Sequence, residues 1–263
     1  MPIVAASYRP VPERLYHYTG GAAAFNIICG GSGKDKEICF WLKNAKSKND
    51  AAELKLGAAL VDELKKYMRR NKRSSLINEV NINPDFVYVN SFTEGEDVTE
   101  HMLGYGHFRL EFDLRACKYK SNIRECTYFQ EKDIDELVAH YCSVFHRDWQ
   151  LISGERKDIN VLCDYLMEEM SAMMSIPLLK HQDEWEEEKE WRHVLHRQPT
   201  DNRIFATPDG SFRMKVYYPA STLTGITCFT TEVKKNEDFR FYDKIKHWVE
   251  TNNWETQVKL KMV

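Results

Sequence analysis

The sequence has 263 residues, in which 37 Lys and Arg nearly balance 40 Asp and Glu, giving a formal net charge of −3. A hydrophobic fraction of 43% supports a buried core and excludes an intrinsically disordered chain. The near-neutral charge argues against a protein that bulk charge alone holds on nucleic acid. The length suits one large domain or two small ones. We expect a single domain over 1–263, because no Ser/Gly linker divides the chain.

Neither a leader nor a membrane segment is expected. The first residues show no basic region followed by an apolar one, and the longest apolar runs fall far below the ~20 residues of a membrane-spanning helix. The seven cysteines are odd in number and form no CxxC pair, which fits neither a zinc site nor a dense disulfide framework. The sequence therefore predicts a cytoplasmic protein without a membrane partner.

The first half of the chain alternates between strand and helix patterns. Helices are predicted over 22–29, a run of small residues, and over 50–70, where Leu56, Leu60 and Leu64 recur at helical spacing. The continuous apolar run at 38–42 predicts a strand buried on both faces. Alternating patterns predict strands over 14–19 and 107–114. β-branched and aromatic residues predict another over 86–92, and one more strand is expected within 119–129.

The second half begins with a helical block and ends in strands. Helical periodicity over 134–145 and 159–174 places this block at about 131–180. Strands are predicted at 190–196, 212–218 and 223–230, before a final helix at 239–249. Strands, then helices, then strands again predict an α+β fold with a mixed, mainly antiparallel sheet, and not the alternation of a doubly wound sheet.

Three segments concentrate polar and aromatic side chains beyond what a plain core needs. They are 16–19 in the first strand, 41–53 at the end of the second, and 186–192 at the start of a late strand. From its spacing alone, His17 is more typical of a hydrogen-bonded core histidine than of a site residue. Glu190 stands out because a carboxylate beside aromatic rings acts at a low effective dielectric. No dinucleotide fingerprint, phosphate loop or nucleophile elbow is present.

These segments resemble one bacterial family, catalogued as domain of unknown function 2971. The matching stretches are Leu-Tyr-His-Tyr-Thr at 15–19, 40–44, Asn49-Asp50 with Glu53, Ser-Phe-Thr-Glu at 91–94, and 188–192. Ala51 stands where the family usually has Pro, and the segment after Glu94 lacks the family's Trp. The layout is similar to ADP-ribosyltransferases of the His-Tyr-Glu kind, which implies a split β-sheet core.

The resemblance implies an enzyme that uses NAD as a substrate and needs no metal. Breaking the nicotinamide–ribose bond develops positive charge on the ribose, and one fixed carboxylate can face that charge. Glu190 would be this catalytic residue, together with His17 and Tyr18, and Glu188 or Arg192 would assist. The implied NAD-binding residues are Tyr16, His17, Thr19, Trp41, Asn44, Asn49, Asp50, Ser91 and Arg192, of which Trp41 and Asn44 would line the nicotinamide side.

The partners and the reaction class stay open at this point. The acceptor of the ADP-ribosyl group would be a macromolecule, either nucleic acid or protein, and the resemblance implies a toxin or anti-phage effector that could have an antitoxin. In a second hypothesis the chain is a nucleic-acid-binding or nuclease module, in which His17, Asp50, Glu53 and Glu190 bind Mg²⁺ or Mn²⁺. In a third, the same residues only pack the sheet of a non-catalytic interaction domain.

Overall fold

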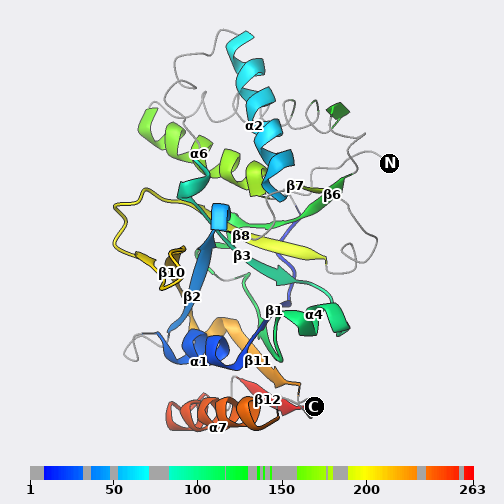
Figure 1. The fold of residues 1–263 in the computed structure, drawn as a ribbon, viewed down its shortest axis with the longest axis vertical. Coiled ribbons are helices and arrows are strands. Elements are labelled where there is room, and N and C mark those ends of the chain that lie inside the picture. Colours follow the sequence, from blue (N-terminus) through cyan, green and yellow to red (C-terminus); the bar gives the residue numbers. More distant parts are fainter. Residues whose placement is uncertain are drawn as a thin grey trace.

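Ten strands form one twisted sheet in the computed structural model of the chain (Figure 1). The structure describes residues 9–31, 37–47, 53–70, 83–115, 117–129, 135–136, 139, 143, 159–175, 177–179, 189–229, 235–254 and 258–263. The main path of the sheet runs in the order β12-β11-β4-β1-β3-β2-β10-β9, while β8 pairs with β3 and β5. The strands are β1 (Leu15–Thr19), β2 (Glu37–Asn44), β3 (Val87–Thr93), β4 (Phe108–Phe112), β5 (Ile123–Glu125), β8 (Glu190–His196), β9 (Ile204–Ala206), β10 (Phe212–Pro219), β11 (Leu223–Cys228) and β12 (Lys259–Met262).

Antiparallel pairing dominates, which confirms the predicted α+β class with a mixed, mainly antiparallel sheet. Within the ten-stranded sheet only β11 and β12 run parallel. A separate parallel pair joins β6 (Thr127–Phe129) to β7 (Pro177–Leu179). The helices are α1 (Gly21–Cys29), α2 (Glu53–Arg70), α4 (Glu100–Tyr105), α6 (Ile159–Ser175) and α7 (Lys235–Thr251).

The sheet forks at β3. One edge of β3 pairs with β8 along its whole length, from Val87 opposite His196 to Thr93 opposite Glu190. The other edge is shared by two strands, because β2 pairs only at 88–89 and β1 only at Thr93. From this point β1 leads into β4, β11 and β12, whereas β2 leads into β10 and β9. Among the described residues, no strand lies beside the edge of β3 between these two contacts.

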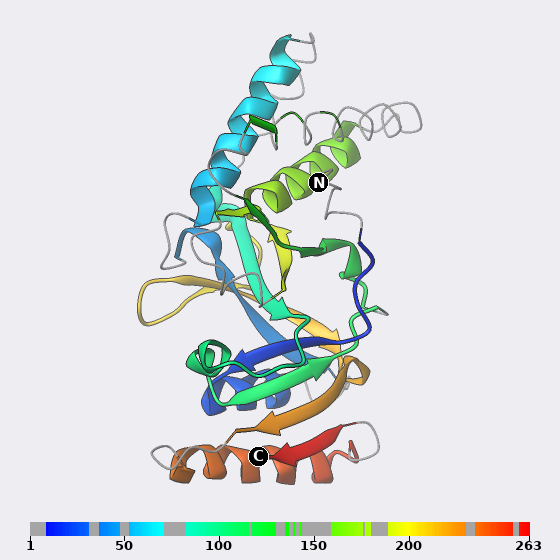
Figure 2. The same cartoon turned by 90° about the vertical axis from the view of Figure 1, so that its right-hand side faces the viewer.

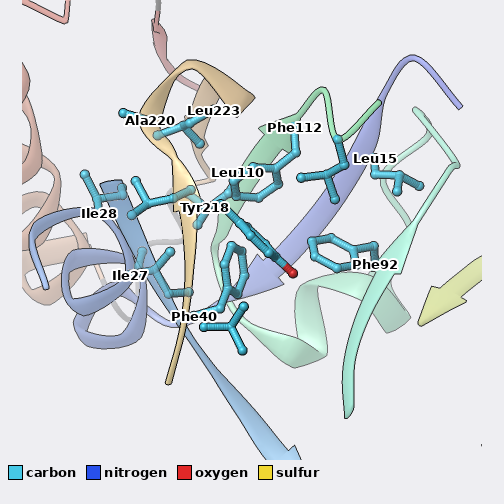
Figure 3. Close-up of a cluster of buried hydrophobic side chains, with 14 of the residues drawn as sticks. Leu15, Ile27, Ile28, Phe40, Phe92, Leu110, Phe112, Tyr218, Ala220 and Leu223 are labelled. Carbon is cyan, nitrogen blue, oxygen red and sulfur yellow. The ribbon is translucent and has the colours of Figure 1, made fainter. Parts of the chain in front are cut away.

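An aromatic core fills the space between the two arms of the fork (Figure 3). The ring of Phe40 on β2 lies 5.0 Å from Tyr218, 5.2 Å from Phe112 and 5.7 Å from Phe92, centroid to centroid. Along β4 every second side chain enters this core, as the alternation of the sequence predicted. Burial of these rings removes a large apolar area from water and holds the arms in place.

Helices cover the two ends of the sheet (Figure 2). At one end α1 packs on β2 and α7, and at the other α6 packs on β8 and α2. Leu60 lies on the buried face of α2, where the helical spacing predicted it. α2 and α6 approach closely at Gly57, where an added Cβ would lie 2.0 Å from the carbonyl oxygen of Met174. No helix within the described ranges is long and apolar enough to cross a membrane.

Several short elements differ from the predicted ones. The single strand expected within 119–129 is instead a 3-10 turn followed by β5 and β6, because the chain passes from one sheet to another: β5 pairs with β8, whereas β6 pairs with β7. The expected helical block at 131–180 contains α6 but also β7, and the helix predicted over 134–145 falls mostly outside the described residues. Trp41 is 42% exposed, so β2 is not buried on both faces. The elements α4, β9 and β12 were not predicted, since each is too short to show a period.

Candidate functional site

A cavity of about 310 Å³ lies at the fork of the sheet. Consecutive residues line it, three from β1 (16–18) and five from β3 (89–93). A pocket on the face of a sheet would be lined by alternate residues, because neighbouring side chains point to opposite faces. Lining by consecutive residues therefore means that the cavity sits in the gap between strands. Its remaining walls are Trp41 and Lys43 of β2, Met102 and Tyr105 of α4, Glu190 of β8 and Arg213 of β10.

The cavity brings together six of the residues that the sequence singled out. They come from four strands that lie far apart along the chain, and they are Tyr16, His17, Tyr18, Trp41, Ser91 and Glu190. Arg192 does not line the cavity but bonds to Glu190. Thr19 is not among the lining residues and pairs with Phe108 of β4. Asn49 and Asp50 lie outside the described residues, as does Glu188.

Asn44, which we expected at the nicotinamide side, bonds to backbone groups near the end of β2. Its side-chain amide donates to the carbonyl of Asp85 at 2.8 Å, and its Oδ1 accepts from the backbone N–H of Lys46 at 3.0 Å. Asn44 is buried and does not line the cavity. It joins the end of β2 to the turn before β3, because backbone groups there lack partners in the ladder.

His17 is held as a neutral imidazole with one defined proton. Its Nδ1 lies 2.9 Å from the carbonyl oxygen of Ser91, and since a carbonyl only accepts, Nδ1 carries the proton. The rings of Phe40 and Phe92 pack against it at 5.4 and 5.9 Å. Burial among them lowers the pKa of His17, and this outweighs the hydrogen bond to Ser91. The neutral ring thus presents Nε2 as a hydrogen-bond acceptor.

Glu190 is a fixed carboxylate at the start of β8, opposite Thr93. The guanidinium of Arg192 donates to both of its oxygens, with Nε to Oε1 at 2.7 Å and Nη2 to Oε2 at 3.1 Å. A third bond runs from Arg192 Nη1 to the carbonyl of Ser175 at the end of α6, at 2.6 Å. The side chain of Arg192 is only 1% exposed. Such a bidentate pair favours the ionised carboxylate and fixes its plane.

Aromatic groups from β1 and α4 form the opposite wall. Tyr16 and Tyr18 point away from His17, because adjacent residues of a strand face opposite ways, and both contribute to a small cluster with Met102. The guanidinium of Arg109 lies 4.8 Å from the ring centre of Tyr16. Burial raises the pKa of Tyr18, so its phenol stays protonated at neutral pH. Tyr105 stands at the rim and is 59% exposed.

The cavity carries a surplus of positive charge. Lys43 and Arg213 line it on neighbouring strands, directly opposite each other in the register of β2 and β10. Neither forms an ion pair with a carboxylate of the described residues, whereas the charge of Glu190 is balanced by Arg192. The site therefore favours an anionic ligand. No motif pointed to Arg213, because only the strand register brings it opposite Lys43.

The metal-binding hypothesis requires a cluster of metal-ligating side chains. No group of three His, Cys, Asp or Glu side chains that could hold a metal occurs in the part of the chain that the structure describes. Asp50 and the side chain of Glu53, which that hypothesis requires, lie outside the described residues.

No protein-family model, curated protein sequence or solved structure matches the chain. The family resemblance stays a prediction from the motifs.

Proposed function

We propose that this cavity binds NAD and that the protein transfers its ADP-ribosyl group to a macromolecular acceptor, with Glu190 as the catalytic residue. One observation carries the proposal: His17 of the first strand and Glu190 of a late strand line the same cavity, in a gap between strands. The toxin or anti-phage role that the motif resemblance implies is part of this proposal.

Glu190 suits the chemistry of the transfer. The bond between nicotinamide N1 and ribose C1′ breaks, and its electron pair leaves with neutral nicotinamide. Positive charge then develops on the ribose, and an ionised carboxylate that accepts a hydrogen bond from the 2′-hydroxyl stabilises it. The acceptor's nucleophilic atom bonds to C1′ and releases a proton. Arg192 offsets part of the carboxylate charge, but it holds the oxygens in one orientation and keeps them ionised.

The other lining groups match the remaining parts of NAD. Nε2 of His17 can accept a hydrogen bond from a ribose hydroxyl, and the rings of Tyr18 and Trp41 offer flat surfaces to nicotinamide. Lys43 and Arg213 provide positive charge for the diphosphate. At about 310 Å³ the cavity lies at the lower end of the range of roughly 300–1,000 Å³ for small-molecule sites. It therefore suits the nicotinamide riboside half, with the diphosphate near the opening.

The test is consumption of labelled NAD, with and without a mixture of protein, DNA and RNA acceptors. We expect Glu190→Gln to slow both transfer and hydrolysis by about 100- to 1,000-fold, because it removes the charge but keeps the shape. The matched control is Glu125→Gln on β5, a carboxylate that pairs with Arg9 and does not line the cavity. Circular dichroism must show both variants folded. A Glu190→Gln variant as active as the wild type would refute the assignment, and nuclease activity that needs a divalent metal but no NAD would favour the metal-binding hypothesis.

A further inference from the structure

Beside the cavity, the outer surface of β2, β10 and β9 carries three cations and two aromatic rings, and Asp209 in the loop between β9 and β10 interacts electrostatically with Arg213. Along these strands alternate residues enter the core, and the residues between them point outward. The register places Arg213 opposite both Lys43 on β2 and Phe205 on β9, and Lys215 opposite Trp41. β2 and β10 run side by side in Figure 1. We name this surface the basic–aromatic face, made up of Trp41, Lys43, Phe205, Arg213 and Lys215.

Like charges stand directly opposite each other on this face. A pair such as Lys43 and Arg213 across antiparallel strands destabilises the sheet, because the two cations repel at short range. Glu37, a carboxylate of the same row, lies at the far end of β2, opposite Pro219. A bound phosphate between the two cations would turn the repulsion into attraction.

Of the two aromatic rings of the face, Trp41 is open to stacking and Phe205 is half-buried. Trp41 is 42% exposed, although tryptophan usually buries most of its surface. Its ring meets Phe205 edge-on at 5.1 Å, and the ammonium of Lys215 lies 5.4 Å from the centre of the Phe205 ring. The face thus combines two rings with three cations and reaches the cavity, which Trp41, Lys43 and Arg213 also line.

We propose that the basic–aromatic face binds single-stranded nucleic acid and that a base of this strand is the acceptor at the cavity. Single strands expose both phosphates for cations and unpaired bases for stacking. A duplex hides its bases within the stack, and an acidic peptide offers no rings in register with its charges. The acceptor role rests on the proposed function: a nitrogen or oxygen of the base bonds to C1′ as nicotinamide leaves, and the base releases one proton to solvent. The binding itself does not depend on it.

The test is fluorescence anisotropy with a short labelled oligothymidylate and its ribonucleotide counterpart over a range of salt concentrations. The titration is carried out without NAD, whose diphosphate would compete for Lys43 and Arg213. Three phosphate contacts then predict a slope of about −2 in log affinity against log salt, or a loss of about 20-fold between 50 and 200 mM. Lys215→Ala should reduce the slope by about 0.7, and Phe205→Ala should weaken binding at least about fivefold. Neither residue lines the cavity. The control is Lys261→Ala on β12, an exposed cation at the opposite end of the strand order.

Any of three results would overturn the inference. The oligonucleotide does not bind at low salt, the salt slope of Lys215→Ala equals that of the wild type, or duplex DNA or polyglutamate competes as well as an unlabelled single strand. NAD hydrolysis without nucleic acid should be unchanged in Lys215→Ala. If NAD is consumed but no oligonucleotide binds, the basic–aromatic face fails alone and the proposed function stands. If oligonucleotides bind as expected but no NAD is consumed, the acceptor role falls together with the proposed function, while the binding surface remains.

Discussion

Replacing Arg192 by Met should destabilise the protein strongly and make its stability depend on pH. The substitution keeps an unbranched side chain but removes two hydrogen bonds to Glu190 and one to the carbonyl of Ser175. Glu190 would remain as a buried carboxylate without its guanidinium, since the side chains of the pair are only 1% and 11% exposed. Breaking such a pair costs about 3–5 kcal/mol, a large share of a typical total of roughly 5–15 kcal/mol.

The pH dependence gives the sharper readout. In Arg192→Met the desolvated carboxylate of Glu190 favours its protonated form. The loss of unfolding free energy relative to the wild type is therefore small at low pH and grows as the pH rises. Urea unfolding should therefore show a smaller loss at about pH 5 than at about pH 8. Adding Glu190→Gln removes the buried charge and should recover roughly 0.5–3 kcal/mol. Three results would refute this account of the site: Arg192→Met loses less than about 1 kcal/mol of unfolding free energy, its loss does not change with pH, or the effects of the two substitutions simply add in the double variant.

Two further predictions concern the core. Burial lowers the pKa of His193 to about 3, so its neutral form supports folding above its ordinary pKa of about 6.5, and this support falls as the pH drops toward 3. Between about pH 7 and 5, the free energy of unfolding of His193→Gln should therefore fall by about 2 kcal/mol less than that of the wild type, as measured by urea unfolding. Equal decreases in the two proteins would contradict this prediction. Gly57→Ala should cost roughly 1–3 kcal/mol in thermal unfolding, because its Cβ would meet the backbone of Met174, while Gly104→Ala, with open space around it, should gain up to about 1 kcal/mol. Similar melting temperatures for the two alanine variants would disprove the close helix crossing.

Local pattern was a good guide wherever one face of an element is buried. The alternation along β4 and the helical spacing at Leu60 identified their buried residues, because burial requires the period of the strand or helix. Short elements such as β9 and α4 hold too few residues to show a period, and only their contacts with longer neighbours define them. Trp41 was placed in a doubly buried strand because an apolar run does not reveal that one side of it opens to solvent.

The sequence by itself determined which side chains could carry chemistry, since the unusual combinations around His17 and Glu190 are local features of the chain. Only the tertiary structure decided that the two line one cavity, because strand order and register depend on pairing between distant segments. The same pairing places Lys43 opposite Arg213, and it brings the side chain of Asn44 to the backbone of the turn before β3. The partner of Glu190 also depends on the fold: Arg192 lies on the same face of β8, and α6 supplies the carbonyl that holds its guanidinium in place.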